Sequence, residues 1–405
     1  MLWIYNIGIG LYQILLRFAS IFNAKAKLFV EGRKNIFEQI KQKVDPNDRP
    51  IWFHFASLGE FEQGKPVLEK LKSISPTQKI VVTFFSPSGY EIKKNYALAD
   101  VFYLPLDTAS HAEKFLALVN PKQAIFTKYE FWFHYFRVLH QKEIPLYLIS
   151  GIFRPKQAFF RRYGKFYRNM LKFVTHFFVQ NTESVALLKS IGITNVTLSG
   201  DTRFDSVYKN AQEVKKLPLI EAFCGNSNVL IAGSTWPKDE SLLVDWSAKH
   251  PDWKLVIAPH EIGATHLQEI ENLFPNAVKF SDLDKFTQNL AQYPQVLIIN
   301  NIGMLSSLYQ YGKIAYIGGG FGVGIHNILE AAAFGLPVIF GPKYEKFQEA
   351  KDLIDLKCAK SISSAQELAL AFDKFTTAEN IAFDIKNYVN TKKGATEVII
   401  KHLCN

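Results

Sequence analysis

The sequence predicts an α/β protein built from two doubly wound parallel sheets. Short apolar runs alternate with helix-like segments along most of the 405 residues, as expected for parallel strands covered by helices on both faces. A polar, lysine-rich stretch over residues 205–218 interrupts this rhythm, and a second series follows it. A chain of this length exceeds one ordinary hydrophobic core. We therefore expect two domains joined by a linker, with a ligand cleft between the carboxyl ends of their strands.

The apolar runs define the expected elements. In the first series, strands are predicted at residues 51–55, 80–85, 101–104, 123–126, 146–149 and 177–179, with a helix at 61–71. In the second series, strands are predicted at residues 228–232, 254–258, 296–300, 314–317 and 337–340. A final helical segment, residues 378–403, can cross back to the first domain.

Residues 2–22 form an apolar stretch that carries one charge, Arg17, and is long enough to span a bilayer. No basic residue precedes the stretch, which fits a cleaved signal peptide poorly. Asn6, Gln13 and Arg17 fall near one stripe of a helix, and the remaining circumference is apolar. The stretch therefore predicts a membrane anchor. A single span, an in-plane helix and a buried helix of a soluble domain all remain open.

The charge balance indicates an anionic partner. Lys and Arg number 47 against 37 Asp and Glu, so nucleic acid, phospholipid and a phosphorylated substrate are the candidate classes. No helix-turn-helix, zinc-finger or RNA-binding signature accompanies the charge, which disfavours nucleic acid. Cys224, Cys358 and Cys404 are far apart and lack metal-ligand spacing. This indicates a reducing compartment without a disulfide framework.

The positive charge is concentrated in residues 151–175, which contain no acidic residue. The basic residues of this segment are Arg154, Lys156, Arg161, Arg162, Lys165, Arg168 and Lys172, and several recur at helical spacing among aromatic residues. The pattern predicts a basic, aromatic helix suited to a membrane surface or an acidic lipid headgroup. The alternative is a solvated helix face whose aromatic side chains pack inward.

A glycine-rich stretch, residues 318–324, lies between a predicted strand and a predicted helix. Bare backbone N–H groups and a helix N-terminus there can hold an anion such as the phosphate of a sugar nucleotide. Glu330 falls in the first helical turn, where a carboxylate can accept two ribose hydroxyls. The alternative is a glycine-rich turn with a capping Glu, because isolated glycine motifs are weak indicators.

In the first domain, Ser57-Leu58-Gly59-Glu60 follows a strand and opens a helix. Gly59 permits close backbone approach, and Glu60 can act as a general base at the strand end. The alternative is that Glu60 only complements a helix N-terminus.

Two further motifs of the first domain follow strands. Ser86-Pro87-Ser88-Gly89 offers hydroxyl and N–H groups to a polar or anionic ligand. The motif Thr127-Lys128-Tyr129-Glu130-Phe131-Trp132 places Glu130 beside aromatic residues, a surface typical of sugar contact; a core aromatic cluster is the alternative.

The second domain carries three short motifs at the ends of strands. Gly233-Ser234-Thr235 can present amides to a phosphate, and Pro259-His260-Glu261 ends the next strand. Ile302-Gly303-Met304 can offer backbone groups to a nucleobase. None of these is decisive alone.

Taken in order, the motifs resemble those of the 3-deoxy-D-manno-octulosonic acid (Kdo) transferases of lipopolysaccharide synthesis. The series consists of the motifs above with Gly200-Asp201-Thr202-Arg203-Phe204-Asp205, His326-Asn327-Ile328-Leu329-Glu330 and Phe340-Gly341-Pro342. The resemblance implies a GT-B glycosyltransferase that is inverting and metal-independent, without cofactor. It implies CMP-Kdo as donor and a lipid A precursor (lipid IVA) as acceptor, at the cytoplasmic side of the inner membrane, with no nucleic acid partner.

The resemblance assigns roles by position. The domains implied are an anchor (1–27), an acceptor domain (28–208), a donor domain (209–377) and the carboxy-terminal helix (378–405). The catalytic base falls on Glu60. The CMP-binding residues expected are Gly233, Ser234, Thr235, Pro259, His260, Glu261, Ile302, Gly303, Met304, Asn327, Ile328, Leu329 and Glu330. The acceptor-binding residues expected are Ser57, Gly59, Ser86, Ser88, Gly89, Glu130, Arg161 and Arg162.

Two departures from the family pattern concern the donor. Pro259-His260-Glu261 stands where many members carry Pro-Arg-His, so a phosphate-binding Arg is missing, and His260, Arg203 or Lys343 could replace it. Residues 324–327 read Gly-Ile-His-Asn where many members have Gly-Gly-His-Asn. The alternatives to a Kdo transferase are another GT-B enzyme that uses a UDP-sugar and a non-catalytic membrane protein that binds acidic glycolipids.

Overall fold

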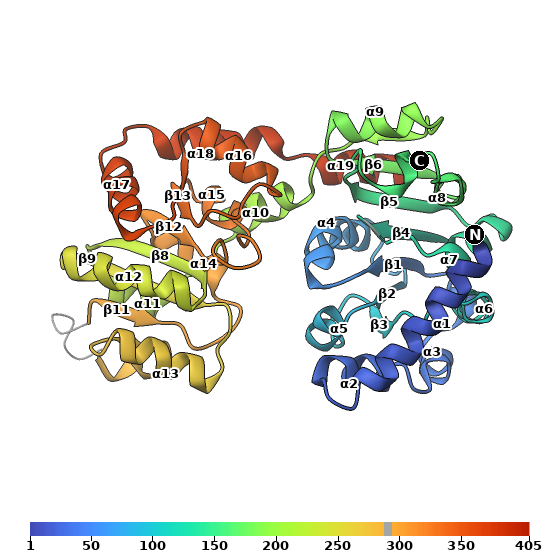
Figure 1. Cartoon of the computed structure of the whole chain (residues 1–405), viewed down its shortest axis with the longest axis horizontal. Coiled ribbons are helices and arrows are strands. Elements are labelled where there is room, and N and C mark those ends of the chain that lie inside the picture. The colour runs from blue at the N-terminus through green and yellow to red at the C-terminus, as the bar shows by residue number, and fades with distance from the viewer. Residues whose placement is uncertain (129, 287–293, 405) are drawn as a thin grey trace. The chain divides into compact units, whose positions relative to one another are not determined.

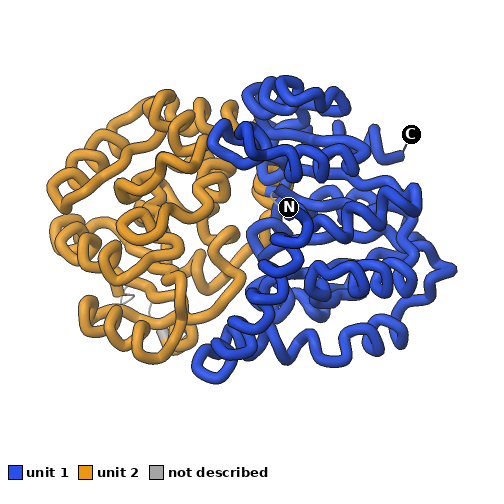
Figure 2. The backbone as a smooth tube through the Cα atoms, turned by 45° about the vertical axis from the view of Figure 1, so that its right-hand side comes forward, with its two compact units in different colours: residues 1–206, 392–405 blue, residues 207–391 orange. Residues whose placement is uncertain are grey.

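The computed structural model describes residues 1–128, 130–286 and 294–404 and contains two compact units (Figure 2). Unit 1 comprises Met1–Ser206 and Lys392–Asn405, and unit 2 comprises Val207–Thr391. Each unit contains one seven-stranded parallel sheet with helices around it (Figure 1). The predicted α/β class with two doubly wound sheets is therefore confirmed.

The sheet of unit 1 has the strand order β3-β2-β1-β4-β5-β6-β7, with every neighbouring pair parallel. Six of its strands were predicted. The seventh is short and partly polar, so it gives no apolar run. The strands are β1 (Ile51–Phe55), β2 (Ile80–Phe84), β3 (Asp100–Tyr103), β4 (Gln123–Thr127), β5 (Leu146–Gly151), β6 (His176–Val179) and β7 (Val196–Leu198).

The helices of unit 1 cover both faces of its sheet. They are α1 (Leu2–Ala19), α2 (Ala24–Glu31), α3 (Ile36–Lys43), α4 (Leu58–Ile74), α5 (Pro87–Lys93), α6 (Ala109–Val119), α7 (Phe133–Gln141), α8 (Lys165–Leu171), α9 (Thr182–Ser190) and α19 (Ala395–Leu403). Short 3₁₀ turns are η1 (Pro46–Asp48) and η2 (Ala158–Phe160).

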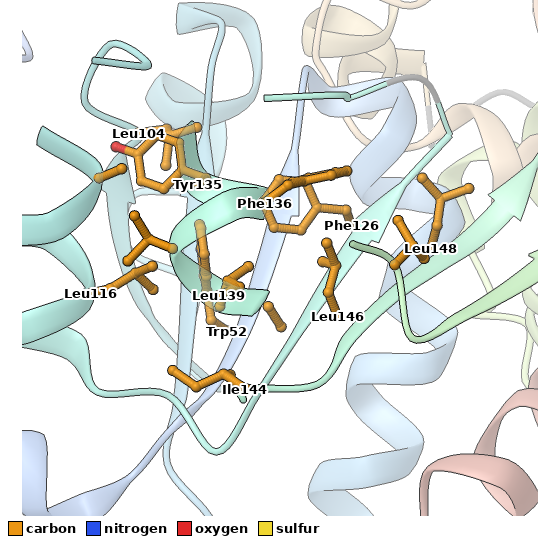
Figure 3. Close-up of a cluster of buried hydrophobic side chains, with 14 of the residues drawn as sticks. Trp52, Leu104, Leu116, Phe126, Tyr135, Phe136, Leu139, Ile144, Leu146 and Leu148 are labelled. Carbon is orange, nitrogen blue, oxygen red and sulfur yellow. The ribbon is translucent and has the colours of Figure 1, made fainter. Parts of the chain in front are cut away.

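Alternation along β1 divides the core of unit 1 into two layers. Trp52 belongs to the cluster formed with α6 and α7, where it lies near Phe126, Tyr135 and Leu139 (Figure 3). Phe53 belongs to the opposite cluster, which contains residues of α4 and α19. Because successive side chains of a strand point to opposite faces, a strand buried on both faces reads as a continuous apolar run.

The sheet of unit 2 has the order β10-β11-β9-β8-β12-β13-β14 and is also parallel. The two edge strands are only two and three residues long, so their sequences give no apolar run from which to predict them. The strands are β8 (Asn228–Thr235), β9 (Trp253–Pro259), β10 (Val278–Lys279), β11 (Val296–Ile298), β12 (Ile314–Ile317), β13 (Val338–Phe340) and β14 (Ala359–Ser361).

The helices of unit 2 include α12 and α17, which pack Trp246 and Phe372 on one face of the sheet. They are α11 (Pro218–Cys224), α12 (Pro237–Lys249), α13 (Ala264–Leu273), α14 (Leu305–Leu308), α15 (Leu329–Ala333), α16 (Gln348–Asp355), α17 (Ala365–Thr376) and α18 (Ile381–Lys392), with 3₁₀ turns η3 (Phe280–Phe286) and η5 (Tyr309–Tyr311).

The predicted linker over residues 205–218 is mostly helical instead. Helix α10 (Arg203–Gln212) crosses the boundary between the units and is followed by α11. Phe204 and Val207, three residues apart, are both buried. A narrow apolar stripe is enough to hold a polar helix against a protein surface, so the lysine-rich composition was misleading.

The carboxy-terminal segment consists of two helices, and the second belongs to unit 1. Between α18 and α19, Gly394 has a φ of +112°, a conformation that favours glycine. Asp205 then accepts hydrogen bonds from the amides of Gly394 (2.5 Å) and Thr396 (2.7 Å) and from the Thr396 hydroxyl (2.7 Å). Ile399 and Ile400 are buried in the core of unit 1.

The basic segment, residues 151–175, is not one continuous helix. Arg161 and Arg162 lie in an exposed turn, and α8 begins only at Lys165. Arg168 donates to the carbonyls of Phe159 (3.0 Å) and Arg161 (2.7 Å), so it stabilises this turn. The aromatic residues Phe159, Phe160, Phe166, Tyr167 and Phe173 pack on the core, whereas Tyr163 is exposed. The prediction of an exposed basic and aromatic helix is therefore wrong for the aromatic side chains.

Helix α1 confirms the predicted amino-terminal helix and lies along unit 1 (Figure 1). The Tyr5 hydroxyl donates to Asp107, and Asn6 Oδ1 lies 2.7 Å from His134 Nε2. Asp107 also accepts the amides of His134 and Tyr135, each at 3.1 Å, and its burial raises its pKa to about 6. The predicted polar stripe thus includes Asn6, which contacts unit 1. Large apolar side chains on the rest of the helix are exposed, among them Trp3, Ile7, Leu11, Ile14, Leu15 and Phe18.

Candidate functional site

In unit 1 the predicted site residues follow strands that end at the same edge of the sheet. Glu60 lies in the first turn of α4, directly after β1, and is half-buried. Ser57 is the N-cap of this helix, and its hydroxyl donates to Glu60 Oε2. The positive end of the helix dipole also interacts favourably with the carboxylate. Gly59 is exposed, and a side chain there would meet only Ser57 Oγ, at 3.8 Å.

The loop after β2 lies beside the loop after β1. The amide of Ser86 donates to the carbonyl of Ala56 (2.8 Å), and Ser86 caps α5 by accepting from the amide of Ser88 (3.3 Å). The two hydroxyls lie 3.0 Å apart, and Ser88 is exposed. The structure therefore brings the serine motif next to the Glu60 motif.

Gly89 belongs to the same motif as Ser86 and Ser88 but lies in a different environment. It is buried, and a Cβ atom there would lie 2.2 Å from the ring of Phe84. The absence of a side chain lets α5 pack closely on β2, so Gly89 contributes to packing.

Glu130 lies in the loop after β4 and forms part of a polar network with β1. Its Oε2 accepts from Trp132 Nε1 (2.9 Å) and lies 3.2 Å from Nε2 of the buried His54. His54 Nδ1 lies 2.9 Å from the Thr83 hydroxyl on β2. The side chain of Glu130 is 15% exposed. Tyr129, in the same motif, lies outside the described residues. Glu130 is thus satisfied within an aromatic cluster and still borders solvent, and contact with a sugar at this position stays a prediction.

Arg161 and Arg162 lie in the loop after β5, and both are exposed. The loops after β1, β2, β4 and β5 leave one edge of the sheet, because these strands are neighbours and parallel. This edge, defined by Ser57, Glu60, Ser86, Glu130 and Arg161, is called the acceptor edge below. It offers two partly buried carboxylates, hydroxyls and cations.

In unit 2 the backbone of the glycine-rich stretch crosses close to two other backbone segments, the loops after β8 and β13. A Cβ atom on Gly318 would lie 2.2 Å from the carbonyl of Ser234, and one on Gly320 would lie 2.6 Å from the backbone of Gly341. The glycines therefore let the chain after β12 approach the loops after β8 and β13. Helix α15, which follows, is the predicted helix and has five residues.

Three aromatic side chains form a cluster beside this crossing. The ring of His260 packs against the rings of both Trp236 (4.9 Å between centroids) and His326 (4.3 Å), at interplanar angles of 26° and 25°. Trp236 Nε1 donates to His326 Nε2 (3.1 Å). Burial, and next the proximity of His260, lowers the pKa of His326 to about 4. His260 itself is exposed and offers a nitrogen-bearing surface to an anion.

Asp239 holds the crossing in place and was not singled out from the sequence. Its carboxylate accepts the amides of Gly319 and Trp236, each at 3.0 Å, and the hydroxyl of Tyr316 at 2.7 Å. Burial is the main cause of its raised pKa. The available signal was Pro237 at the first helical position with an acid two residues later, which is typical of a helix N-terminus.

The other predicted donor residues differ in accessibility. Thr235 is fully buried and donates to Glu240 (2.8 Å), whereas Ser234 has a φ of +53° and is half-buried. Gly233 is buried beneath Tyr309, because a Cβ atom there would lie 2.3 Å from its hydroxyl. Pro259 is half-buried and Glu261 is exposed.

The remaining donor residues lie after β11 and β12. Ile302 and Gly303 are exposed, and Met304 is the N-cap of α14. Ile328 and Leu329 are fully buried, so only their backbone atoms remain for a ligand. Asn327 Nδ2 donates to Glu330 Oε1 (3.0 Å), which orients that half-buried carboxylate.

The three candidates for the missing phosphate-binding Arg are placed differently. Arg203 donates to Asp201 Oδ2 through Nε (2.9 Å) and Nη2 (2.7 Å), and it lies in unit 1. Lys343 Nζ donates to the carbonyl of Gly322 (2.6 Å), at the glycine-rich stretch. His260 and Lys343 therefore lie beside the glycine-rich stretch of unit 2, whereas Arg203 belongs to unit 1.

Comparison with known proteins supports the family resemblance. Residues 31–206 match the family model described as 3-deoxy-D-manno-octulosonic-acid transferase (kdotransferase). Residues 31–206 are therefore similar to the Kdo transferase family. This confirms the resemblance predicted from the motifs, and the family is one of glycosyltransferases.

Relatives extend this similarity beyond the matched residues. A 3-deoxy-D-manno-octulosonic acid transferase of Aquifex aeolicus is 27% identical over 75% of this chain and 79% of its own length. One from Rickettsia bellii is 26% identical over 84% of this chain and 82% of its own. A bifunctional glycosyltransferase/methyltransferase of Fusobacterium nucleatum is 24% identical over 93% of this chain, which spans 60% of that relative.

Solved structures resemble the whole chain in fold. The UDP-GlcNAc 2-epimerase of Neisseria meningitidis has a TM-score of 0.60 at 16% identity and covers 88% of this chain and 99% of its own. The UDP-GlcNAc 2-epimerase of Methanocaldococcus jannaschii has a TM-score of 0.56 at 14% identity and covers 84% and 99%. The predicted GT-B fold is thus confirmed. Within the ranges 1–128, 130–286 and 294–404, no cluster of His, Cys, Asp and Glu could hold a metal ion.

Proposed function

We propose that this protein transfers Kdo from CMP-Kdo to a lipid A precursor (lipid IVA) with inversion at the anomeric carbon. The observation that carries the proposal is the placement of Glu60. Within a segment that matches the Kdo transferase family, this carboxylate begins a helix at the carboxyl edge of a parallel sheet and is partly open to solvent. Open α/β sheets bind ligands at this edge.

In this mechanism Glu60 accepts the proton of a glucosamine hydroxyl as that hydroxyl attacks the anomeric carbon of Kdo. The Ser57 hydroxyl, which donates to Glu60, orients the carboxylate. The bond to the CMP phosphate breaks on the opposite face, so a single displacement inverts the centre. General-base assistance of this kind is worth about 10² to 10⁴ in rate.

The donor is assigned to unit 2. Backbone amides near the glycine-rich stretch, with His260 and Lys343 beside it, offer positive charge to the phosphate of CMP as it leaves. His260 occupies the position of the missing Arg. Asn327 and Glu330, which are hydrogen-bonded to each other, present a carboxylate for the ribose.

The acceptor is assigned to the membrane surface, on the cytoplasmic side of the inner membrane. Helix α1 is long and apolar enough to cross a membrane by length and composition. However, Tyr5 and Asn6 bind it to unit 1, while its other side chains are exposed. We propose that α1 lies in the plane of the membrane with these side chains in the interface, as amphipathic anchors do. Inner membrane lipids are then partners of the protein.

The experiment that tests the proposal is incubation of the full chain with CMP-Kdo and lipid IVA, followed by mass spectrometry of the lipid. Wild-type protein is expected to add one or more Kdo mass increments. Glu60→Gln is expected to lower the rate by about 10² to 10⁴ while CMP affinity and the melting temperature stay unchanged. Glu62→Gln on the same helix, whose carboxylate lies 3.5 Å from Lys93, serves as the matched control.

Two results would remove the proposal. Full transfer by Glu60→Gln would exclude Glu60 as the base. Tighter binding of UDP than of CMP in calorimetry, together with no transfer, would favour the alternative of a GT-B enzyme that uses a UDP-sugar.

A further inference from the structure

A cavity of about 640 Å³ lies beside α1 in unit 1, at a place that the proposed reaction does not use. It is lined by residues of α1, α2, α3 and α6 and of the loop after β3. Its volume falls within the range of about 300 to 1,000 Å³ that is typical of small-molecule sites. The apolar part of its lining consists of Leu16, Phe29, Val30, Ile36, Phe37 and Leu106.

The cavity is lined by four cations, Arg17, Arg33, Lys34 and Lys114, and by one carboxylate, Glu38. Arg17, Lys34 and Lys114 are exposed at its rim, and the Lys114 ammonium lies 4.6 Å from the ring centroid of Phe37. Among the described residues, none of the four cations forms an ion pair with a carboxylate. An anion would therefore find a net positive field at this site, because Glu38 offsets only one of the four positive charges.

Arg33 forms an inner wall of the cavity. Its guanidinium donates to the carbonyls of Leu104 (2.8 Å), Phe29 (3.0 Å) and Phe85 (2.7 Å) and lies 3.5 Å from the ring centroid of Phe29. Burial lowers the pKa of Arg33 to about 9, so the side chain stays charged at neutral pH. Its positive charge is stabilised by the backbone carbonyls that accept its hydrogen bonds and by the face of the Phe29 ring.

The position of the cavity decides the class of ligand. Gln13, Leu16 and Arg17 of α1 line it, while Ile14, Leu15 and Phe18 of the same helix are exposed and apolar. A ligand with an apolar chain and an anionic head would thus pass between the membrane-facing side of α1 and the cavity. Basic residues beside an interfacial helix are typical of sites for anionic lipids.

We propose that this cavity binds one anionic glycerophospholipid of the membrane on which α1 lies. An acyl chain lies along the apolar lining, and the phosphate lies toward Arg17, Lys34 and Lys114. The inference rests on the proposed membrane placement of α1 and is independent of Kdo transfer.

The cavity is separate from the acceptor edge. Arg33 donates to the carbonyl of Phe85, whose ring lies 4.6 Å from that of Trp132, and Trp132 donates to Glu130. These side chains form a wall between the cavity and the loop that carries Glu130. No residue of the acceptor edge lines the cavity. The structure therefore favours a resident phospholipid over the lipid acceptor here.

The test is native mass spectrometry of the detergent-purified full chain with phosphatidylglycerol or phosphatidylcholine of the same acyl chains. Wild-type protein is expected to retain one phosphatidylglycerol and little phosphatidylcholine. Lys34→Gln with Lys114→Gln removes two charges and is expected to weaken retention by about 30-fold. Lys79→Gln with Lys122→Gln is the matched control, because these exposed lysines lie at the opposite, amino-terminal edge of the sheet.

The proposed site would be contradicted by equal retention of phosphatidylglycerol and phosphatidylcholine. It would also be contradicted if the two double variants lost phosphatidylglycerol to the same extent. Displacement of phosphatidylglycerol by an equimolar amount of lipid IVA would overturn the choice of phospholipid as the occupant. Because no donor is present, these results do not depend on whether the protein transfers Kdo.

Discussion

Two carboxylates border the acceptor edge, and their hydrogen bonds give them different chemistry. Glu130 Oε2 accepts from Trp132 and lies against His54, so this oxygen is held within the protein. Glu60 accepts a hydroxyl donor from Ser57 and is half-buried at the start of its helix. A general base must reach a substrate proton, which favours Glu60. Glu130 is better suited to hold the loop that meets the acceptor.

His326 in unit 2 should make the free energy of unfolding depend on pH. Burial, with the nearby His260, lowers its pKa to about 4, below its value of about 6.5 in an unfolded chain. As pH falls from about 6.5 to 4, the unfolded state takes up a proton that the folded state does not, so the free energy of unfolding decreases. His326→Gln removes this contribution. Urea unfolding at pH 7 and pH 5 should therefore show a larger loss for the wild-type protein than for the variant.

The His326 prediction has a clear contrary result. If the wild-type protein and His326→Gln lose the same free energy of unfolding between pH 7 and pH 5, the histidine is protonated equally in the folded and unfolded states. The Gln side chain can still accept the hydrogen bond of Trp236 Nε1, so the comparison keeps the contact and removes the titration.

The sequence indicates candidate site residues where a motif closely follows a strand, as at Glu60 and Ser86. It does not predict residues whose role depends on a neighbouring strand. Asp239 binds Gly319 only because β8 and β12 are adjacent in the sheet. Trp236 likewise meets His326, 90 positions away. The burial of Gly89 under Phe84 is a packing relation that the motif could not reveal.

At the scale of elements, the attachment of α1 can be tested. Tyr5→Phe with Asn6→Ala removes the partners of Asp107 and His134 on this helix. Each hydrogen bond contributes about 0.5 to 1.5 kcal/mol net, so loss of the two should lower the free energy of local opening of α1 by about 1 to 3 kcal/mol. Hydrogen exchange should show faster exchange in residues 2–19, with the amides of β1 unchanged. Tyr12→Phe is the control, because among the described residues that hydroxyl forms no hydrogen bond. Equal protection in both variants would mean that apolar contacts alone hold the helix.

The turn that carries Arg161 and Arg162 gives a second prediction at this scale. Both side chains are exposed at the acceptor edge, so Arg161→Glu with Arg162→Glu should repel an anionic membrane surface. We expect slower transfer to lipid IVA in anionic vesicles, unchanged CMP binding and a smaller difference at high salt. Lys79→Glu with Lys122→Glu makes the same change in charge at the opposite edge of the sheet. Similar rates for the two variants would show that net charge, not this turn, matters.

Helices and strands were predictable where a clear run of apolar residues marked them. The amino-terminal helix and eleven of the strands follow from such runs. The break between Arg162 and Lys165 was not predictable, because it depends on Arg168 binding the carbonyls of Phe159 and Arg161. Helix α10 was missed because two buried residues, Phe204 and Val207, anchor an otherwise polar segment.

At the scale of the whole molecule, the chain leaves unit 1 at Ser206 and returns at Lys392. Asp205 binds the start of α19 through three hydrogen bonds, although the partners are separated by 189 and 191 positions. The sequence predicts two sheets, because each series of strands is local. It cannot predict which core receives the last helix, since both cores are apolar.

The last prediction concerns this returning helix. Truncation after Thr391 removes Ile399 and Ile400, which are 0% and 5% exposed in the core of unit 1. Burial of one such side chain stabilises by about 1.5 to 3 kcal/mol, so unit 1 should lose about 3 to 6 kcal/mol. In calorimetry the transition of unit 1 should move to lower temperature, while that of unit 2 stays in place. A peptide of residues 392–405 should restore the first transition, and truncation after Leu403 should leave it unchanged. A shift confined to unit 2 would contradict the assignment of α19.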